Sequence, residues 1–475
     1  MTASYRAVNM SLVVGICLSI ILTTSYGLAN CHHRLRNIYP TFDSLPVLED
    51  VGEPLILTSY IQSGDVDMAR KLAKVSEEPF VGLVTSYSGY LTVNPDLNSN
   101  LFFWFFPAEF GYEEAPLLLW LQGGPGVSSL FGLFGENGPF SVDETGSKLI
   151  RRPSSWHRNH SIIYIDSPVG TGYSFTERDE GYATNQTQIG SELYTALLQF
   201  LWLFPELQTH DFFITGESYA GKYIPALGYT IYKNNPLSDL KINLKGLAIG
   251  NGFTDPLTQS RSADLLFSLG LIDRKYADGL RSREDQFVEA LSTGNYSEAY
   301  NINAGFSDVY SGVCRIENEY NYLDNAPSHF DDGSYTIFVQ DADVRRALHV
   351  GNSSFSNGDL VSEHLVDELL VSVKPWVEEL LNNSFRVVFY NGQLDLAVPY
   401  MASEAMFQTL NFDGAEEYAR ANRTWWYVEG VLAGYFKSAG TLTEILVRDA
   451  GHMVPTDQPA YALDLLRRVI EDRFD

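Results

Sequence analysis

The sequence is poor in cysteine. Its 475 residues include three cysteines, which are Cys17, Cys31 and Cys314. Because Cys17 lies in an N-terminal apolar segment, the rest of the chain can form at most one intrachain disulfide, between Cys31 and Cys314. The sequence leaves open whether these two cysteines pair. A chain of this size buries enough surface to be stable without disulfides, so the fold does not depend on a disulfide framework.

Positive charge is also scarce. The chain holds 32 Lys and Arg against 59 Asp and Glu, which gives a formal net charge of −27. Proteins that bind nucleic acid through its phosphates need a basic surface, so we expect no nucleic-acid partner. An acidic surface instead suits an acidic or secretory compartment. With 45% hydrophobic and 19% charged residues, the composition also excludes a disordered chain.

No later hydrophobic run is long enough to span a bilayer, but the N-terminus carries a short one. A single charge, Arg6, precedes an apolar run from about Leu12 to Leu22, and small residues follow up to Gly27. The run is shorter than the ~20 residues that a membrane span needs. We therefore predict that residues 1–27 are a secretory signal peptide rather than a membrane anchor, and that the protein is secreted or reaches a lysosomal or endosomal compartment.

Six Asn-x-Ser/Thr sequons agree with passage through the secretory pathway. The predicted glycosylation sites are Asn159, Asn185, Asn295, Asn352, Asn382 and Asn422.

Strand signals begin near residue 86. Tyr87–Val93 alternates in polarity, Asn94-Pro95-Asp96 marks a turn, and Leu101–Phe106 is rich in β-forming aromatics, which together predict a hairpin. Further apolar runs do not alternate with polar residues, as strands with one solvent-exposed face would. We therefore expect these strands to be buried on both faces. These runs are Leu117–Leu121, Ile162–Ile165, Phe212–Ile214, Leu247–Ile249, Val387–Tyr390 and Ile445–Val447.

Helical segments lie between several of these strands, at about Gln188–Phe204, Tyr219–Tyr232 and Ala460–Glu471. Alternation of strands and helices predicts an α/β fold with a mostly parallel central sheet and helices on both faces. The sequence from about 253 to 369 is more polar and leans towards helix, so we interpret it as a cap inserted into the sheet domain. The core is then residues 86–252 and 370–475, preceded by an N-terminal segment, residues 28–85.

The strongest local signal surrounds a serine. In the segment from Asp211 to Gly221, a buried-type strand runs into small residues on either side of Ser218, and a helix follows. This pattern is typical of a nucleophile elbow, in which small residues two before and two after the serine allow a sharp turn that exposes Oγ. The second small position is Ala220 rather than the glycine of the strict pattern. Ser218 is therefore the candidate nucleophile.

A serine hydroxyl needs a base that a carboxylate orients, and in this arrangement the chain order is serine, acid, histidine. Asp395 follows the strand Val387–Tyr390, and His452 follows the strand Ile445–Val447. Both lie just past strand ends, where open α/β sheets bind ligands. The alternative for His452, a histidine at the edge of the core, does not explain this order. The sequence thus predicts a Ser218-Asp395-His452 triad.

Acyl transfer also needs donors for the oxyanion that develops in the transition state. The strand that ends at Leu121 is followed by Gln122-Gly123-Gly124-Pro125-Gly126, whose backbone N–H groups can approach a substrate closely. A second donor is the N–H of Tyr219, the residue after the nucleophile. The alternative is a glycine-rich turn that only reverses the chain direction.

Several motifs in order along the chain strongly resemble the serine carboxypeptidases, from about residue 86 to the C-terminus. The segment around Asn98–Ala108 and Gln122 looks most like the vitellogenic carboxypeptidase branch of that family. The matching segments are Trp120–Gly126, Glu136–Pro139, Tyr164–Ser174, Gly216–Gly221 and Gly451–Pro455.

The resemblance implies an α/β-hydrolase fold with a helical cap, the triad named above, and oxyanion donors at Gly124 and Tyr219. It further implies that the terminal carboxylate of a peptide is bound by Gln122, Gly123, Glu136 and Glu217. A carboxylate is a hydrogen-bond acceptor and is bound best by donors. At least one of the two glutamic acids must therefore be protonated to help bind it.

Two positions depart from the family pattern. Gln122 replaces the usual asparagine and is one methylene longer, which keeps the amide donor but moves it. Val127 stands where many members have cysteine, so the usual disulfide framework is largely missing.

The predicted function is a serine carboxypeptidase that acts on peptide and protein C-termini through an acyl-enzyme at acidic pH. The alternatives are an acyltransferase or esterase on the same scaffold, and a secreted binding protein with little turnover. We expect no cofactor and no metal, because the histidines lack ligand-like spacing. The sequence does not reveal the oligomeric state.

Overall fold

The computed structural model describes residues 49–474 apart from 77–79, 81–83, 305, 307–308 and 325–332. The predicted signal peptide and Cys31 lie outside the described residues, so neither the signal nor a Cys31–Cys314 disulfide is tested. None of the helices in the described part combines the length and the apolar character that crossing a bilayer requires.

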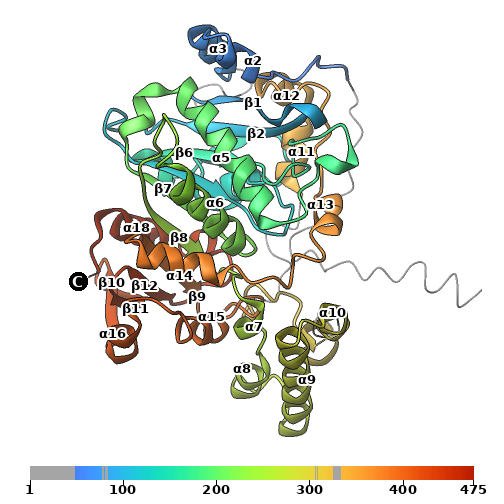
Figure 1. Cartoon of the computed structure of the whole chain (residues 1–475), viewed down its shortest axis with the longest axis vertical. Coiled ribbons are helices and arrows are strands. Elements are labelled where there is room, and N and C mark those ends of the chain that lie inside the picture. The colour runs from blue at the N-terminus through green and yellow to red at the C-terminus, as the bar shows by residue number, and fades with distance from the viewer. Residues whose placement is uncertain are drawn as a thin grey trace, which may run out of the picture. The chain divides into compact units, whose positions relative to one another are not determined.

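A ten-stranded sheet lies at the centre of the fold, in the order β1-β2-β6-β3-β7-β8-β9-β12-β11-β10 (Figure 1). The six strands from β6 to β12 are parallel, whereas the strands at both edges pair antiparallel. The sheet strands are β1 (Tyr87–Asn94), β2 (Ser99–Phe106), β3 (Leu117–Leu121), β6 (Ser161–Ile165), β7 (Phe212–Glu217), β8 (Leu244–Gly250), β9 (Arg386–Gly392), β10 (Thr424–Val428), β11 (Val431–Ala439) and β12 (Leu442–Val447). A separate hairpin joins β4 (Phe140–Val142) and β5 (Leu149–Arg151).

The apolar side chains of the central strands explain why these strands are buried. All residues of β2, β3, β6, β7 and β12 are buried, as expected for strands covered on both faces. The predicted β1–β2 hairpin, the six buried runs and the mostly parallel sheet are confirmed. The β10–β11 hairpin was not predicted. Its two turn residues, Glu429 and Gly430, both have positive φ, which is the conformation of a tight type I′ hairpin turn.

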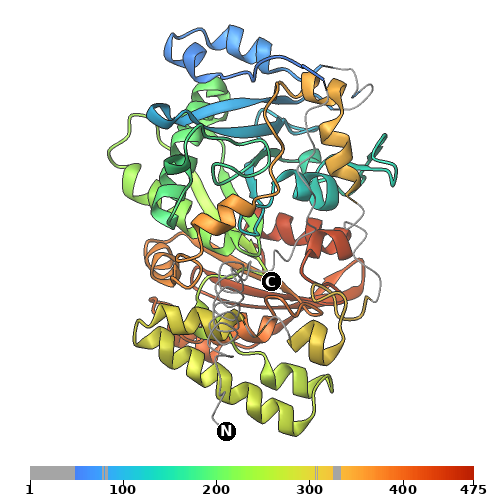
Figure 2. The same cartoon turned by 90° about the vertical axis from the view of Figure 1, so that its right-hand side faces the viewer.

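Helices cover both faces of the sheet (Figures 1 and 2). Three of them, α5 (Gln186–Leu203), α6 (Ala220–Asn234) and α14 (Lys374–Asn382), pack together over one face, and α18 (Pro459–Glu471) lies over the other. Asn185 is the N-cap of helix α5, and its side chain accepts a hydrogen bond from the Gln188 N–H and so satisfies an orphan donor of the first turn. The three predicted helices are confirmed to within two residues at each end.

Smaller helices fill the connections. Before the sheet lie α2 (Thr58–Gln62) and α3 (Val66–Ala73), and after β3 come α4 (Leu130–Gly132) and the π-helix η2 (Leu133–Asn137). The C-terminal part adds α15 (Tyr400–Phe407), α16 (Ala415–Arg420) and α17 (Val454–Asp457).

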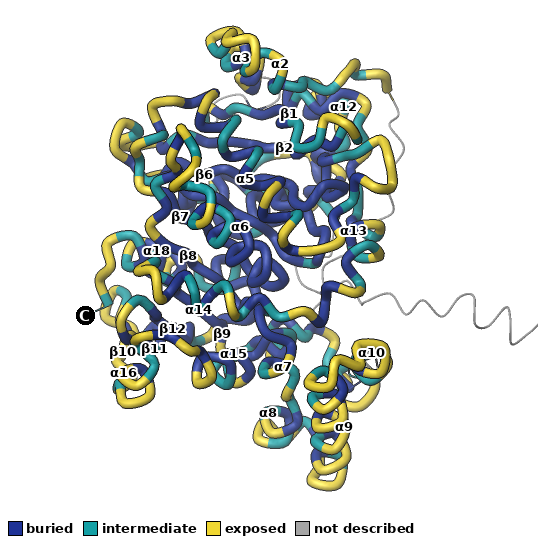
Figure 3. Tube along the Cα trace, in the orientation of Figure 1, coloured by how far each residue is buried: buried dark blue, intermediate teal, exposed yellow. Residues whose placement is uncertain are grey.

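Residues 253–369, which we propose as the inserted cap, leave the sheet after β8 and return before α14. They pack as two separate groups (Figure 1). The first group comprises α7 (Pro256–Gln259), α8 (Ala263–Ser268), α9 (Arg274–Ser292) and α10 (Tyr296–Ala304), and its outer surface is largely exposed (Figure 3). The second comprises α11 (Ser334–Gln340), α12 (Ala342–Ala347) and α13 (Asp359–His364).

The two groups have different hydrophobic cores. Helices α8 and α9 share a small cluster that includes Leu266, Leu280 and Leu396, and Leu396 follows Asp395 directly. In contrast, Phe338 and Val344 of α11 and α12 belong to the main core of the sheet domain. The insertion therefore touches the sheet domain through the loop after β9 as well as through its second group of helices.

Candidate active site

Ser218 lies at the sharp turn between β7 and α6. Its φ of 61° is a left-handed conformation that costs a non-glycine residue on the order of 1–2 kcal/mol. Backbone hydrogen bonds hold it there: the Ser218 N–H donates to the Gly250 carbonyl at 2.9 Å, and its carbonyl accepts from the N–H groups of Gly221 and Phe253, each at 2.9 Å. The turn has the strained geometry that a nucleophile elbow requires.

The small residues around Ser218 are required by close packing. A Cβ at Gly216 would lie 2.1 Å from the Leu121 carbonyl oxygen, and one at Gly123 would lie 2.7 Å from Cβ of Ser218. Ala220 is fully buried, and its Cβ would lie 3.3 Å from a Cβ added at Gly216. The methyl of Ala220 is thus accommodated beside Gly216, whereas glycine itself is needed at positions 216 and 123.

Asp395 and His452 meet because they follow neighbouring parallel strands, β9 and β12, whose carboxyl ends lie at one edge of the sheet. His452 Nδ1 and Asp395 Oδ2 are 2.8 Å apart, and both side chains are buried. The carboxylate also accepts hydrogen bonds from the N–H groups of Ala397 at 2.8 Å and Val398 at 3.2 Å. These donors fix the carboxylate so that it orients the imidazole.

Asn251 is a site residue that the sequence analysis missed. Its side-chain Nδ2 donates to Asp395 Oδ2 at 2.7 Å, and its backbone N–H donates to the Tyr390 carbonyl at 2.7 Å. It directly follows β8, so its place just past a strand end is the signal that could have identified it. Asn251 links the elbow to the acid, because the preceding residue, Gly250, accepts the Ser218 N–H.

A residue from the connection between β8 and β9 also orients His452. The His452 N–H donates to the Tyr320 carbonyl at 2.7 Å, and the Tyr320 ring lies 5.3 Å from the imidazole, centroid to centroid. A Cβ at the preceding residue, Gly451, would lie 2.1 Å from the same carbonyl oxygen. This contact with a residue between β8 and β9 has no signal in the local sequence of either partner.

The side chains expected to bind a terminal carboxylate form one buried cluster. Gln122 Nε2 donates to Glu217 Oε1 at 2.8 Å, and Gln122 Oε1 accepts from Trp120 Nε1 at 2.8 Å. The amide orientation is thereby fixed from both ends. Glu136 lies in η2, and its carboxyl is close enough to Glu217, Gln122 and His452 for all three to lower its pKa.

Burial dominates the ionisation of Glu136. Its carboxyl oxygens are buried, and neither makes a hydrogen bond of normal geometry with another described residue. Desolvation raises the pKa of Glu136 to about 7, against the opposing effects of Glu217, Gln122, His452 and Arg152. Glu136 is therefore mostly protonated in an acidic compartment and becomes charged as the pH rises through neutrality.

Arg152 holds the helical turn that carries Glu136. Its guanidinium donates to the carbonyls of Leu133 at 3.1 Å, Phe134 at 2.5 Å and Gly138 at 2.9 Å, which surround Glu136 in the chain. The Leu133 carbonyl also accepts from the Gly138 N–H at 3.2 Å, so Arg152 adds side-chain donors to the backbone bond that closes this short π-helix. Arg152 was not among the residues predicted from the sequence.

The predicted oxyanion donors lie beside the elbow. Gly124 has a φ of 111°, which only glycine adopts readily, and a Cβ at the preceding Gly123 would lie 2.7 Å from the Tyr219 nitrogen. The glycine loop and the first residue after Ser218 are therefore adjacent, as a two-donor oxyanion site requires.

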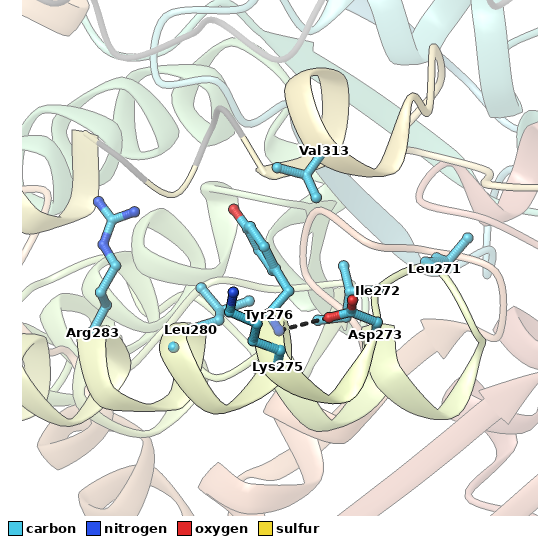
Figure 4. A pocket seen from close by; sticks show the side chains of 9 residues that line it. Leu271, Ile272, Asp273, Lys275, Tyr276, Leu280, Arg283 and Val313 are labelled. Carbon is cyan, nitrogen blue, oxygen red and sulfur yellow. Dashed lines mark hydrogen bonds between the residues drawn. The ribbon is translucent and has the colours of Figure 1, made fainter.

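A separate pocket of about 570 Å³ lies in the inserted segment, along the start of α9 (Figure 4). Its lining includes Tyr276, Lys275 and Arg283, and Asp273 accepts a hydrogen bond from the Tyr276 N–H at 2.8 Å. None of the predicted site residues lines it. Among the described residues, no group of three His, Cys, Asp or Glu side chains could hold a metal ion.

All six sequon asparagines are exposed, as a glycosylation acceptor must be. Their glycosylation stays a prediction.

Comparison with known proteins identifies the family. The family model described as serine carboxypeptidase matches residues 78–472. The venom serine carboxypeptidase of Apis mellifera is 44% identical over 449 residues, covering 92% of this chain and 95% of the relative. The vitellogenic carboxypeptidase of Aedes aegypti is also 44% identical, covering 87% of this chain and 89% of the relative.

Among solved structures, the prohormone-processing carboxypeptidase Kex1(delta)p from Saccharomyces cerevisiae is similar in fold. Its TM-score is 0.75 at 24% sequence identity, and the match covers 85% of this chain and 96% of that one. This structural likeness supports the fold alone. The family model and the two insect relatives match this chain in sequence over most of its length. The chain belongs to the serine carboxypeptidase family.

Proposed function

We propose that this serine carboxypeptidase removes C-terminal residues from peptides and proteins in an acidic compartment of the secretory pathway, through a covalent acyl-enzyme. The observation that carries the proposal is the buried cluster of Gln122, Glu136 and Glu217 next to the elbow of Ser218. Binding of a free substrate carboxylate explains why two buried glutamic acids lie at this place, whereas hydrolysis of a substrate without a carboxylate does not require them.

The proposed reaction uses the triad in two steps. Ser218 Oγ attacks the scissile carbonyl carbon while His452 takes the hydroxyl proton, and His452 then gives that proton to the leaving amine. Water next attacks the acyl-enzyme, His452 takes a proton from the water, and it returns this proton to Ser218 Oγ. Asp395 orients His452 and stabilises the imidazolium, and the N–H groups of Gly124 and Tyr219 stabilise the oxyanion in both steps.

Selection for C-termini comes from charge balance in the cluster. A substrate carboxylate would add a third acid to Glu136 and Glu217, which is unfavourable unless the pair carries a proton. With Glu136 protonated, the pair presents an O–H donor, and Gln122 Nε2 and the Gly123 N–H add further donors. The same balance disfavours binding above neutral pH, in line with an acidic compartment.

The first prediction concerns the nucleophile. Ser218→Ala should abolish labelling by a fluorophosphonate, because no other serine is proposed to sit on a strained elbow beside the triad histidine. The measurement is in-gel labelling of the purified variant and the wild type. The matched control is Ser167→Ala, which removes another buried serine hydroxyl and should label normally. Equal labelling of Ser218→Ala and wild type would refute the assignment.

The second prediction concerns Asn251. Asn251→Ala removes a donor to the Asp395 carboxylate, so the orientation of His452 loosens and kcat should fall by roughly ten- to a hundredfold. KM for a blocked dipeptide should change little, because the Asn251 side chain binds Asp395 and the Gly392 N–H rather than the carboxylate cluster. Steady-state kinetics on a folded variant checks this expectation. A variant with unchanged kcat would show that Asn251 does not help to orient the acid.

The third prediction concerns pH. Between about pH 5 and pH 8, Glu136 passes through its pKa of about 7, so a peptide with a free carboxylate should bind less well as the pH rises. Its KM should increase by roughly tenfold, which corresponds to the loss of one charge-assisted hydrogen bond. The same peptide as a C-terminal amide adds no third charge, so its KM should change less.

Glu136→Gln supplies the test of cause. Glutamine keeps the shape and a donor but cannot ionise, so the KM of the free-acid peptide should become nearly independent of pH. Parallel KM profiles for acid and amide in the wild type would contradict the proposed carboxylate cluster.

A further inference from the structure

Lys222 is a buried lysine that the proposed mechanism does not use. It lies in the first turn of α6, four residues after Ser218, and is fully shielded from solvent. Its ammonium donates to the backbone carbonyls of Glu368 at 2.8 Å, Leu369 at 2.7 Å and Val371 at 2.6 Å. All three donor positions are thus filled by carbonyls of one distant segment of the chain.

That segment is the return limb, residues 356–371, which carries α13 and runs from the last part of the proposed cap into the first residues of the core that follows it. It rests on the glycine loop next to the elbow: Ser362 Oγ donates to the Pro125 carbonyl at 3.0 Å. A Cβ at Gly126 would lie 2.8 Å from the carbonyl oxygen of Gly358. The limb therefore packs against the loop that contains Gly124.

The lysine also contacts the elbow itself. Its ammonium lies 5.3 Å from the ring centroid of Tyr219 and 5.6 Å from that of Phe253, within the range of cation–π attraction. The limb reaches α5 as well, because Glu368 Oε1 accepts from the Gln186 N–H at 3.2 Å. Lys222 is thus the point where the elbow helix and the return limb are joined.

We propose that Lys222 is a positioning residue: its ammonium clamps the return limb against the nucleophile elbow and so holds the glycine loop in place for oxyanion stabilisation. The clamp requires three N–H donors, so it acts only while the lysine is protonated. Because it rests on the proposed roles of Ser218, Gly124 and Tyr219, its effect should appear in kcat rather than in the KM set by the carboxylate cluster.

The surroundings of Lys222 make the clamp sensitive to pH. Three titratable groups face it: Glu368 on the limb, Asp255 after β8 and the Tyr219 phenol at the elbow. Burial lowers the pKa of Lys222 from its ordinary value, and Glu368 and Asp255 oppose this shift. As the pH rises, the neutral amine keeps two N–H groups and turns a lone pair towards a carbonyl, which weakens the clamp.

The experiment compares Lys222→Met with Lys233→Met at about pH 5. Lys233 lies on the same helix but pairs with Glu379 at the surface, so its variant is the matched control. Lys222→Met leaves three carbonyls without their donor, and kcat for a blocked dipeptide should fall about tenfold with KM within about twofold of wild type. Hydrogen–deuterium exchange of residues 356–371 should become faster in Lys222→Met and stay unchanged in Lys233→Met.

A second variant covers the case in which Lys222→Met does not fold. Glu368→Gln keeps the three carbonyl contacts and an acceptor for the Gln186 N–H but removes the negative charge beside the ammonium. The pKa of Lys222 should then fall further, and the loss of kcat at high pH should begin at a lower pH than in wild type, with kcat at about pH 5 unchanged. A residue with only a structural role would not shift this profile.

The outcomes separate the two proposals. Equal kcat and equal exchange in Lys222→Met and Lys233→Met would overturn the clamp, as would an unshifted pH profile in Glu368→Gln. If wild-type protein failed to cleave blocked dipeptides, the proposed function would fall, while the exchange comparison would still decide whether Lys222 holds the limb.

Discussion

The Glu136 and Glu217 carboxyls are both buried and lie close to each other. Glu136 lies in the π-helix before β4, and Glu217 lies at the end of β7. Two neighbouring buried acids resist double ionisation, so this region must hold a proton or exclude further negative charge. The rest of the site is arranged around that constraint. Trp120 fixes the Gln122 amide, Gln122 donates to Glu217, and Arg152 binds the carbonyls around Glu136.

The catalytic arrangement depends on the sheet as much as on these side chains. Strands β7, β8, β9 and β12 are parallel neighbours, so the residues just past their carboxyl ends gather at one edge. Ser218, Asn251, Asp395 and His452 each occupy such a position. The insertion then adds contacts that the sheet alone lacks: Tyr320 binds the His452 backbone, and the return limb rests on the glycine loop. Orientation at the site is thus shared between core and insertion.

Much of this could be predicted from the sequence, because buried parallel strands leave continuous apolar runs and the elbow leaves small residues at fixed spacing. Ser218, Asp395 and His452 stand in the required order, and the structure brings Asp395 and His452 into contact. The β10–β11 hairpin was missed, although Trp425-Trp426-Tyr427 before Glu429-Gly430 carried a strand and turn signal. Tyr320 and Lys222 contact backbone groups far away in the chain, and Arg152 binds the carbonyls of a preceding turn. Such contacts have no local sequence pattern. The division of the insertion into two packing groups depends likewise on long-range contacts.

The central claim is that the pair Glu136 and Glu217 shares a proton when it binds a substrate carboxylate. The most direct test measures the number of protons that the protein takes up when the substrate binds. The Ser218→Ala substitution prevents turnover, so calorimetric titration of that variant with a blocked dipeptide in two buffers of different ionisation enthalpy measures proton uptake. With the pKa of Glu136 at about 7, we expect binding to take up most of one proton at about pH 7.5 and almost none at about pH 5. Binding at about pH 7.5 without proton uptake would contradict it.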